Sequence, residues 1–479
     1  MRGQMPRRTS GDNLAMPDAF ELGRSIVEGK LDLLCPRMTL LRCPSYHETV
    51  MTGCGVIRAN ERGELSFRLS GSLPHPFPEV FRGDRPPGSM YDIDDHVMLV
   101  AVDAEGREWR SNPLLIHLKH PGELVHGYMS RKLASILHTH RWPSNGKSTI
   151  RIYIPRQSRF PFDLSTKSER LAGDTLVAGA WSIDHHVRTI GDATVTFREE
   201  RDRWLSVTAK QATPLMPDWP GLMCHALSFA TSDLMRPAVV VRAFNDREDI
   251  GLFSGPFHKY HSRMPRPIVG LTPEDAGPFW SLVERVFMFA WNRRTASLQF
   301  LEELDAIRAG AAMSIQTACL TLAIGIEALA KELLPAVPAP GWNEEARASL
   351  ESHIKTWGGD SQTRNRALGW LCSKGEPRAV DRLRAWAQQH SIDQRLIDEW
   401  SALRNRSAHG TSLAEAQPSY DRYYSVVELL YRLIATAIGY DGSILKTSIR
   451  GWGQDDELRT GSLPPSDEGD AQAEPKPQN

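Results

Sequence analysis

The spacing of apolar residues changes character about half-way along the chain. Across residues 65–69 and 150–154, apolar side chains alternate with polar ones. A period of two predicts strands that bury one face. Gly-containing strings at 60–63 and 103–106 have the composition of hairpin turns and lie beside such runs. We therefore expect residues 21–262 to form a β-rich region.

Two parts of the N-terminal half depart from this pattern. Residues 121–137 have helical spacing toward their end, so the half is predicted to be α+β. The string 184–186, Asp-His-His, is predicted to be a β-turn with paired imidazoles rather than a phosphoesterase site. Residues 1–20 are polar, lack the apolar core of a signal peptide, and are predicted to be disordered.

After about residue 262 the apolar spacing becomes helical. Residues 263–271 form a predicted linker, and Thr272 followed by Pro273 is typical of a helix start. Apolar residues beyond it recur every three or four positions, beginning with Val283, Val286, Phe287 and Ala290. The pattern predicts a helical bundle over residues 272–450.

Three segments of the second half have distinct patterns. Residues 311–334 are apolar nearly all round, which predicts a helix at the centre of the bundle. Residues 335–389 are predicted to be loop-rich, and the acidic, Pro-rich residues 451–479 to be disordered. A seam for another helix is predicted by the apolar residues Tyr424, Val427, Tyr431, Ile434 and Ile438.

Charge and cysteine content narrow the function classes. With 57 Lys+Arg and 58 Asp+Glu the formal net charge is -1, which excludes a globally basic nucleic-acid-binding protein but permits a local basic site. The 6 cysteines contain no CxxC pair, which favours reduced thiols over a disulfide framework or a zinc ribbon. Residues 309–326 are uncharged but contain several polar side chains, so a bundle helix is favoured over a membrane span. We expect a cytoplasmic protein without a metal, another cofactor or a membrane partner.

The string LRNRSAHG at 403–410 concentrates the candidate chemistry. Arg404 offers a planar, permanently charged fork of donors for the non-bridging oxygens of a phosphodiester. His409 is the side-chain type that exchanges a proton near neutral pH, and Asn405 adds an amide. RNA carries its own nucleophile, the 2′-OH, so a site for its cleavage needs only to position, deprotonate and stabilise. The string alone fits equally well a helix end capped by His409 and stopped by Gly410.

The helix predicted over 392–403 sets the geometry of this string. Its apolar residues, predicted to face a core, are Leu396, Trp400 and Leu403. Asn405 and His409 are four apart and share one face if the helix continues. Arg404 and His409 are five apart, about 140° around a regular helix. Their joint use requires a curled Arg side chain, a helix break near Gly410, or a second chain that completes the site.

A late bundle helix that ends in R-N-x-x-x-H resembles the HEPN domain (higher eukaryotes and prokaryotes nucleotide-binding). A typical form of that motif, RN-x-x-A-HG, is present here as Arg404-Asn405, Ala408 and His409-Gly410. The segment LTLAIGIEAL at 320–329, which contains Glu327, is similar to an apolar helix with an internal Glu in that superfamily. The resemblance covers roughly residues 272–440. A β-rich half joined to such a bundle resembles the ApeA-like anti-phage proteins in architecture.

The resemblance implies an α+β multidomain protein whose all-α, HEPN-like bundle is a metal-independent endoribonuclease. It implies an abortive-infection effector that cleaves RNA, with tRNA a candidate, and an N-terminal half that senses a phage-derived trigger or engages the substrate. His409 would exchange protons with the 2′-OH and the leaving oxygen, Arg404 would stabilise the phosphorane-like charge, and Asn405 would orient the phosphate or the His. Glu327 would hold Arg404, or else be a structurally satisfied bundle residue. The site would form across a homodimer.

Two other functions fit the same residues. The bundle would be a non-catalytic RNA- or nucleotide-binding module if the motif only grips phosphate, or a dimerisation unit if the Tyr424–Ile438 seam is its interface. A second RNR string, at 364–366, has Gly369 at the position five beyond Arg364, so no base is present there.

Overall fold

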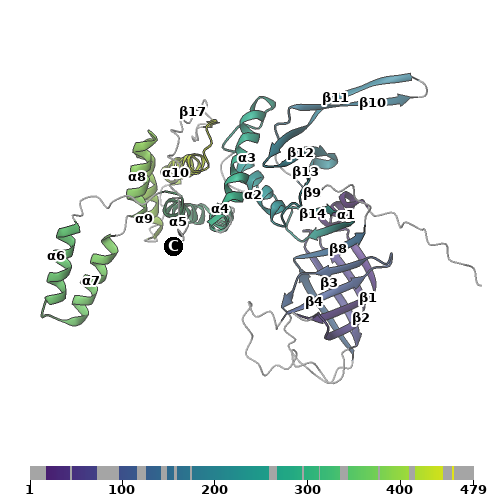
Figure 1. The fold of residues 1–479 in the computed structure, drawn as a ribbon, viewed down its shortest axis with the longest axis horizontal. Helices are drawn as coiled ribbons and strands as arrows, with labels where there is room; N and C mark the ends of the chain where they lie inside the picture. Colours follow the sequence, from purple (N-terminus) through teal and green to yellow (C-terminus); the bar gives the residue numbers. More distant parts are fainter. Residues whose placement is uncertain are drawn as a thin grey trace, which may run out of the picture. The chain divides into compact units, whose positions relative to one another are not determined.

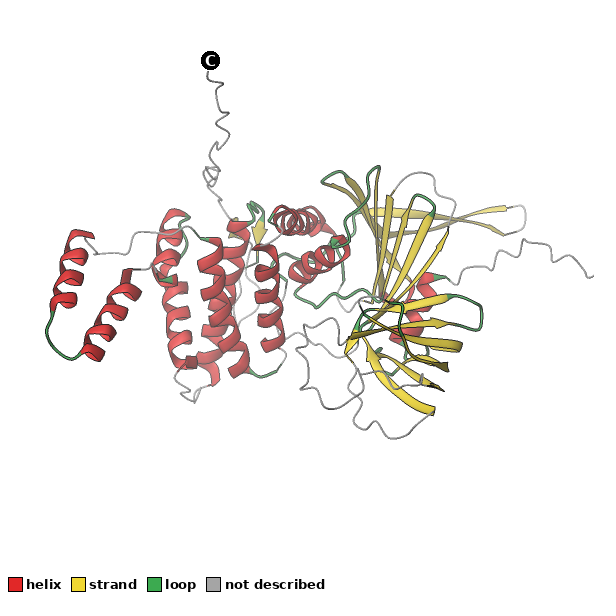
Figure 2. Ribbon diagram, turned by 60° about the horizontal axis from the view of Figure 1, so that its bottom comes forward, coloured by secondary structure: helices red, strands yellow, loops and turns green. Residues whose placement is uncertain are grey.

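The structure is a computed structural model that describes residues 18–43, 46–72, 96–115, 126–141, 148–155, 159–172, 175–257, 267–293, 296–311, 313–334, 344–375, 378–408, 416–445 and 456–457. The chain divides into two compact units. The first comprises Met1–Cys224 and Leu234–Tyr260, and the second His225–Asp233 and His261–Asn479. The first is β-rich and the second is helical, as the sequence predicts (Figures 1 and 2).

A 15-stranded sheet forms the first unit. Its strands follow the spatial order β10-β11-β12-β13-β9-β14-β15-β8-β5-β4-β1-β2-β3-β7, with β6 paired to β4 off this path. Their bounds are β1 (Asp32–Arg42), β2 (Thr49–Ala59), β3 (Leu65–Ser72), β4 (His96–Val102), β5 (Glu108–Ser111), β6 (Leu114–Leu115), β7 (His126–Leu133), β8 (Ser135–Arg141), β9 (Ser148–Pro155), β10 (Leu164–Ala172), β11 (Thr175–Ile190), β12 (Ala193–Glu200), β13 (Trp204–Gln211), β14 (Val239–Phe244) and β15 (Arg247–Phe253). The pairings between these described strands are antiparallel, so much of the order is built from hairpins.

The alternating pattern does set the buried face of the strands. Leu65, Phe67 and Leu69 of β3 are fully buried, and so are Ile150, Ile152 and Ile154 of β9. The turn before β3 forms as expected because the side-chain oxygen of Asn60 accepts hydrogen bonds from the backbone N–H groups of Arg62 and Glu64, each at 2.9 Å. Gly63 in that turn has a φ of 75°, a conformation that glycine adopts without strain.

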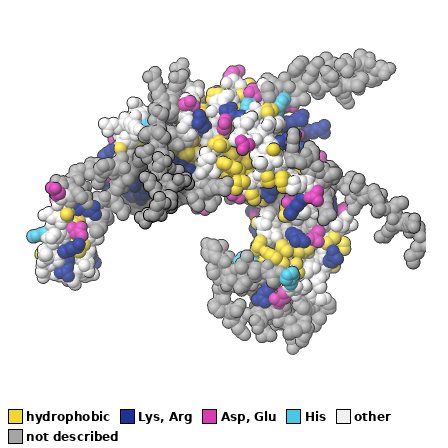
Figure 3. Space-filling model, viewed as in Figure 1, with side chains coloured by type: hydrophobic (Ala, Val, Ile, Leu, Met, Phe, Trp, Pro, Cys, Tyr) yellow, Lys and Arg dark blue, Asp and Glu magenta, His cyan; other side chains and the backbone are white. Residues whose placement is uncertain are grey.

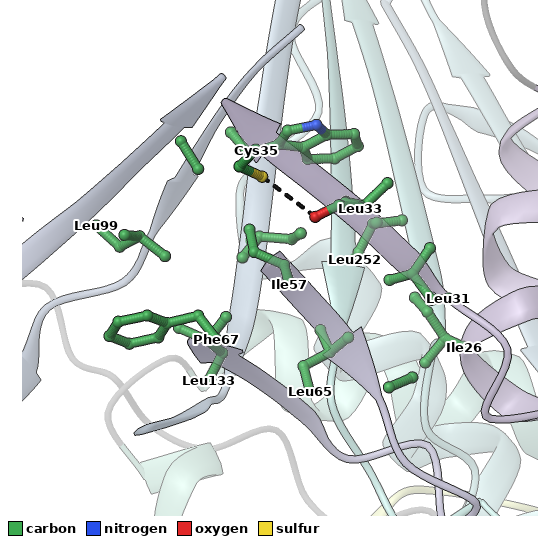
Figure 4. Packing of buried hydrophobic residues seen from close by; sticks show 14 of the residues in the cluster. Ile26, Leu31, Leu33, Cys35, Ile57, Leu65, Phe67, Leu99, Leu133 and Leu252 are labelled. Carbon is green, nitrogen blue, oxygen red and sulfur yellow. Dashed lines mark hydrogen bonds between the residues drawn. The ribbon is translucent and has the colours of Figure 1, made fainter. Parts of the chain in front are cut away.

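The core of the first unit is formed mainly by residues of the strands, and Leu22, Ile26 and Val27 of helix α1 (Ala19–Val27) belong to it (Figure 4). Ile26 of α1 is buried in the same cluster as Leu33, Ile57 and Phe67 of the strands. Gly23 allows the close approach, because a Cβ there would lie 2.6 Å from a methyl group of Val239. Burial of this apolar surface provides the main stabilisation of the unit.

Two expectations for the N-terminal half are wrong. The helix expected toward the end of 121–137 is absent from the described part, because His126–Leu133 and Ser135–Arg141 are strands β7 and β8. The segment is held by neighbours far away in sequence, since β7 pairs with β3 and β8 pairs with β15. The expected turn at Asp184–His186 lies instead within strand β11. The predicted disordered range 1–20 overlaps the start of α1, and residues 1–17 of it lie outside the described residues.

Helices dominate the second unit. Their bounds are α3 (Ala276–Asn292), α4 (Ala296–Ala311), α5 (Ile315–Leu333), α6 (Glu344–Thr356), α7 (Ser361–Gly375), α8 (Ala379–Gln389), α9 (Gln394–Ala408) and α10 (Ala416–Ala437). The expected start at Thr272 is confirmed, because a 3-10 turn, Pro273–Asp275, precedes α3 and the Asp275 carboxylate accepts from the Thr272 backbone N–H at 2.9 Å. Helix α5 contacts α4, α8, α9 and α10, so it lies centrally. The C-terminal half of α2 (Trp219–Thr231) belongs to this unit as well.

Small residues let α4 and α5 approach closely. A Cβ on Gly310 of α4 would lie 2.1 Å from the hydroxyl of Thr321, and one on Gly325 of α5 would lie 2.6 Å from the side chain of Ile307. The contact therefore depends on glycine on both helices.

The region predicted to be loop-rich, 335–389, is largely helical. It contains α6, α7 and α8, while residues 335–343 and 376–377 lie outside the described part. Residues 267–271 of the predicted linker are described and contain no helix or strand, while 263–266 lie outside the described part. In the tail 451–479, predicted to be disordered, residues 456–457 form strand β17 (Asp456–Glu457), which pairs with β16 (Ser443–Ile444), and the other tail residues lie outside the described part. Within the described residues, no helix is long and apolar enough to cross a membrane.

Candidate active site

Helix α9 carries the Arg404–His409 string on a well-packed scaffold. The Asp393 carboxylate accepts the backbone N–H of Arg395 at 2.9 Å and so caps the start of the helix. The residues predicted to face the core, Leu396, Trp400 and Leu403, are buried. The helix continues to Ala408, the residue directly before His409.

Two successive contacts join α9 to α5. The indole Nε1 of Trp400 donates to the carbonyl oxygen of Ala323 at 3.0 Å. One turn further along both helices, Nε of Arg404 donates to Oε2 of Glu327 at 2.6 Å. Positions four apart lie on the same face of a helix, so the buried contact fixes where the exposed one forms.

The expected pairing of Glu327 with Arg404 is thus present. The Arg404 side chain is 44% exposed and that of Glu327 is 23% exposed. The pair uses one of the five N–H donors of the guanidinium, on a side chain that solvent reaches. An anion in solution therefore has access to Arg404 while Glu327 holds its Nε.

Glu327 has a second cationic partner that the sequence interpretation missed. Nζ of Lys331 lies 3.0 Å from Oε1 of Glu327, one helical turn along α5. Burial raises the pKa of the Glu327 carboxyl, but the hydrogen bonds from Arg404 and Lys331 outweigh it and the pKa lies below its ordinary value. The three side chains carry one negative and two positive charges, so the Glu327 carboxylate is shared by two cations. The Glu-x-x-x-Lys spacing is a signal from which Lys331 was predictable.

Of the other motif residues, Asn405 lies within the described part of the chain. Asn405 is exposed, next to Arg404 on the last turns of α9. His409 and Gly410 lie outside the described residues. The structure therefore brings Arg404 and Glu327 together, with Asn405 as the next residue of α9.

Further contacts fix the two helices that carry the site. Nη1 of Arg382 on α8 donates to the carbonyl oxygens of Lys331 at 3.1 Å and Leu334 at 2.9 Å, which satisfies the C-terminal end of α5. Glu399 on α9 forms an ion pair with Arg422 on α10. Sequence spacing could not find these partners, because each lies on a helix distant in sequence.

The seam on α10 does not face outward. Val427, Tyr431, Ile434 and Ile438 are buried within the chain. The hydroxyl of Tyr431 lies 3.0 Å from that of Ser232, and its ring packs edge-on against Phe229. The prediction of a packing seam is confirmed for these four residues, whose side chains are covered by the same unit, while Tyr424 is half-buried. Dimerisation through this seam stays a prediction.

An exposed apolar stripe lies instead on α5. Leu320 and Ile324 are exposed although the pattern predicted a helix buried all round, and Ile324 keeps 53% of its surface in solvent. They precede Glu327 by seven and three positions, so the stripe and the Arg404 pair share one face of the helix.

Other candidate chemistry in the chain is structural. In β11, Nδ1 of His186 lies 2.7 Å from the carboxylate of Asp163, and Nδ1 of His185 lies 2.9 Å from that of Asp184. No group of three or more His, Cys, Asp and Glu side chains within the described ranges is placed to hold a metal ion.

Comparisons with protein-family models, with curated proteins and with solved structures gave no match for this chain. The function must therefore be argued from the site alone.

Proposed function

We propose that this chain is a metal-independent endoribonuclease of the HEPN type that acts as a cytoplasmic anti-phage effector. The observation that carries the proposal is the ion pair between Arg404 and Glu327, 2.6 Å from nitrogen to oxygen, at the end of a helix whose next residues include Asn405 and His409. An accessible guanidinium held in place by a carboxylate, and followed in the sequence by an amide and an imidazole, supplies the residue types that phosphodiester transesterification needs.

The proposed reaction uses the substrate's own nucleophile. His409 removes the proton of the ribose 2′-OH, and the 2′-oxygen attacks the adjacent phosphorus. The bond from phosphorus to the 5′-oxygen of the next nucleotide breaks, and an imidazolium returns a proton to that oxygen. The products are a 2′,3′-cyclic phosphate and a 5′-OH end. Arg404 neutralises charge on the non-bridging oxygens, Asn405 orients the phosphate or the imidazole, and Glu327 keeps Arg404 in place.

The proposal includes a homodimer. Arg404 and His409 are five residues apart, which separates them by about 140° on a regular helix. A partner chain that brings its own Arg and His to the same cleft removes this difficulty. The exposed Leu320 and Ile324 on the face of α5 that carries Glu327 are the apolar surface where a second copy fits. The Ile324→Asp variant should be monomeric by analytical ultracentrifugation and should lose cleavage.

Cleavage in EDTA by purified protein is the direct test. Wild type should cut RNA to 5′-OH ends, and His409→Ala and Arg404→Ala should not, with unchanged far-UV circular dichroism. Arg395→Ala is the matched control, because Arg395 is a solvent-exposed arginine on the same helix, near its opposite end. Equal cleavage by wild type and His409→Ala would refute the proposal. RNA binding without cleavage by either form would favour a non-catalytic binding module.

Expression in cells tests the biological part of the proposal. Wild type, but not His409→Ala, should arrest growth on phage infection, and sequencing of RNA ends should find defined cut sites, tRNA among the candidates. A phage-derived trigger acting through the N-terminal half is expected to be required. Arrest by both forms alike would contradict a nuclease-based effector.

A further inference from the structure

Helices α6 and α7 form a hairpin with almost no core of its own. The short connection 357–360 turns the chain back, and the two helices pack against each other (Figure 1). Among the hairpin residues whose burial is described, only Leu371 is buried. A pair of short helices gains little stability from so small a buried surface, so its exposed side chains are not there to serve a core.

The hairpin exposes two tryptophans. Trp357 keeps 45% and Trp370 keeps 57% of its surface in solvent. Elsewhere in the described chain, tryptophans such as Trp280, Trp219 and Trp400 are buried. Large rings that remain accessible are unusual, because burial of each would contribute a large apolar surface.

The turn of the hairpin holds Trp357 in place. Nη1 of Arg364, in the first turn of α7, donates to the carbonyl oxygen of Trp357 at 3.3 Å. The Asp360 carboxylate accepts the backbone N–H of Thr363 at 2.7 Å and caps α7. The Trp357 ring packs so closely on Gly359 that a Cβ there would lie 2.3 Å from it. The ring is thus supported by the backbone of the turn while nearly half of its surface stays accessible.

Positive charge accompanies the two rings. Helix α7, which carries Trp370, contains Arg364, Arg366 and Lys374 and no acidic residue. Helix α6 contains three glutamates and pairs Lys355 with Glu351 at 2.6 Å, so the excess of positive charge lies on α7. The whole chain has a net charge of -1, so this is a local concentration. Figure 3 shows Lys and Arg side chains exposed on the hairpin, beside hydrophobic, acidic and histidine side chains.

We propose that the α6–α7 hairpin binds single-stranded RNA, with bases stacked on Trp357 and Trp370 and phosphates held by the neighbouring arginines. Accessible aromatic rings interleaved with cations are the combination that unpaired nucleotides recognise, because every base has a π-face and every linkage a negative charge. This inference rests on the proposed ribonuclease function for the identity of its ligand, and it adds the substrate class: an unpaired strand or loop rather than a regular duplex.

A second copy of the chain is a poorer occupant. The α7 helices of two copies would bring together the same three cations, which repel each other, and the exposed large apolar residues of the described hairpin are Leu350, Trp357 and Trp370, too few for an extended apolar patch. An apolar protein partner would need such a patch.

The test measures RNA binding by fluorescence anisotropy on full-length His409→Ala protein, so that substrate is not consumed. The probe is a labelled single-stranded oligoribonucleotide of mixed sequence, with its duplex as comparison. Loss of one stacked base corresponds to about a fivefold weaker affinity. The Trp357→Ala/Trp370→Ala double variant should therefore bind the single strand more than tenfold less tightly, and Trp357→Tyr/Trp370→Tyr should keep most of the affinity. Arg366→Gln should lower the salt dependence of binding by about 0.7 in the log–log slope.

Leu350→Ala is the matched control, since Leu350 is an exposed apolar residue of the same hairpin. Unchanged binding in the double alanine variant would overturn the inference, and so would tighter binding of the duplex. An equal loss in Leu350→Ala would point to a protein-like apolar contact and would also overturn it. The tyrosine variants keep the test valid if circular dichroism shows that the alanine variant has lost helix.

The two proposals fail separately. Wild type that binds RNA through the tryptophans but cuts none would refute the ribonuclease and uphold the hairpin site. Wild type that cuts RNA while the double alanine variant binds and cuts equally well would refute the hairpin site alone.

Discussion

Two helix pairs of the second unit are held in opposite ways. Helices α5 and α9 meet through buried residues, with Trp400 donating to Ala323 inside the bundle and Arg404 bound to Glu327 at its surface. Helices α6 and α7 meet over little buried surface and present Trp357 and Trp370 to solvent. The first pair positions a few polar atoms through a buried contact. The second pair, α6 and α7, instead presents the accessible rings of Trp357 and Trp370.

This difference matches two requirements of the proposed ribonuclease function. Chemistry needs a positioned group, because a displacement of about 1 Å can reduce the rate by two orders of magnitude. Binding an unpaired strand needs accessible rings and charges, and it tolerates movement because stacking has little sequence or positional demand. We infer that the bundle supplies the first and the hairpin the second.

The largest expected difference concerns tryptophan. Trp400→Ala should lower the free energy of unfolding by about 3–5 kcal/mol, since it removes a buried ring and leaves a cavity. Trp370→Ala should cost less than about 1 kcal/mol, since the ring is largely in solvent already. Urea unfolding followed by circular dichroism measures both. Equal losses would show that the hairpin is packed as firmly as the bundle.

Two glycine-to-alanine substitutions are expected to change the stability of the protein in opposite directions. Gly310→Ala should destabilise by about 1–3 kcal/mol, because the new Cβ meets Thr321 and the α4–α5 contact must open. Gly369→Ala in α7 should stabilise its helix by about 0.5–1 kcal/mol, because nothing lies within 4 Å of the new Cβ and alanine has the higher helix propensity. Thermal unfolding compares the two, and a loss of stability in Gly369→Ala would mean that α7 is covered.

Two Glu–Lys pairs with the same spacing, Glu327–Lys331 and Glu351–Lys355, allow two effects to be distinguished: the loss of the group that holds Arg404 and the loss of a glutamate charge in general. Glu327→Gln should reduce RNA cleavage by about 10- to 100-fold, because Arg404 loses its fixed position, and stability by only about 0.5–1 kcal/mol, because the pair is partly exposed. Glu351→Gln breaks the Glu351–Lys355 pair on α6 and should leave cleavage intact. If both variants cleave like wild type, Glu327 is a structural residue only.

The smallest effect is a difference in pH dependence between two glutamates of α5. The pKa of Glu327 is lowered, so the stability it contributes is present above the ordinary value of 4.5 and is lost as pH falls through the lowered one. Burial raises the pKa of Glu332, with Arg293 opposing and Glu303 adding to it, so its charged form weakens the fold as pH rises past 4.5.

Unfolding curves of Glu327→Gln and Glu332→Gln at acid and neutral pH measure these contributions. Glu327→Gln should be less stable than wild type at neutral pH and equal to it in acid. Glu332→Gln should be more stable than wild type at neutral pH. A change in stability of the same sign for both variants at neutral pH would contradict the opposite pKa shifts of Glu327 and Glu332.

Local sequence was sufficient wherever one face of an element meets a core. The alternation at 65–69 identified the buried side of β3, the spacing of Leu396, Trp400 and Leu403 identified that of α9, and the Asn60 turn followed from short-range hydrogen bonding. The pairing of Glu327 with Arg404 was also anticipated, from the resemblance of both segments to one family.

Local sequence failed where the partner is remote or missing. Residues 126–133 form a strand because β3 offers an edge, which no pattern within the segment records. Helices α6 and α7 bury few residues, so the periodic signal that marks a helix packed against a core is weak there and the sequence pattern predicts loops. Ile324 looks like a core residue from its neighbours in sequence and is exposed in the chain.

The chain's order of residues therefore specified the strand faces, the α9 helix and the chemical groups of the candidate site, because periodicity and residue type are local properties. The meeting of Arg404 with Glu327, the burial of the α10 seam and the exposure of the hairpin tryptophans depend on which surfaces come together across long stretches of chain. Those contacts are set by the packing of whole elements, and only the folded structure contains that information.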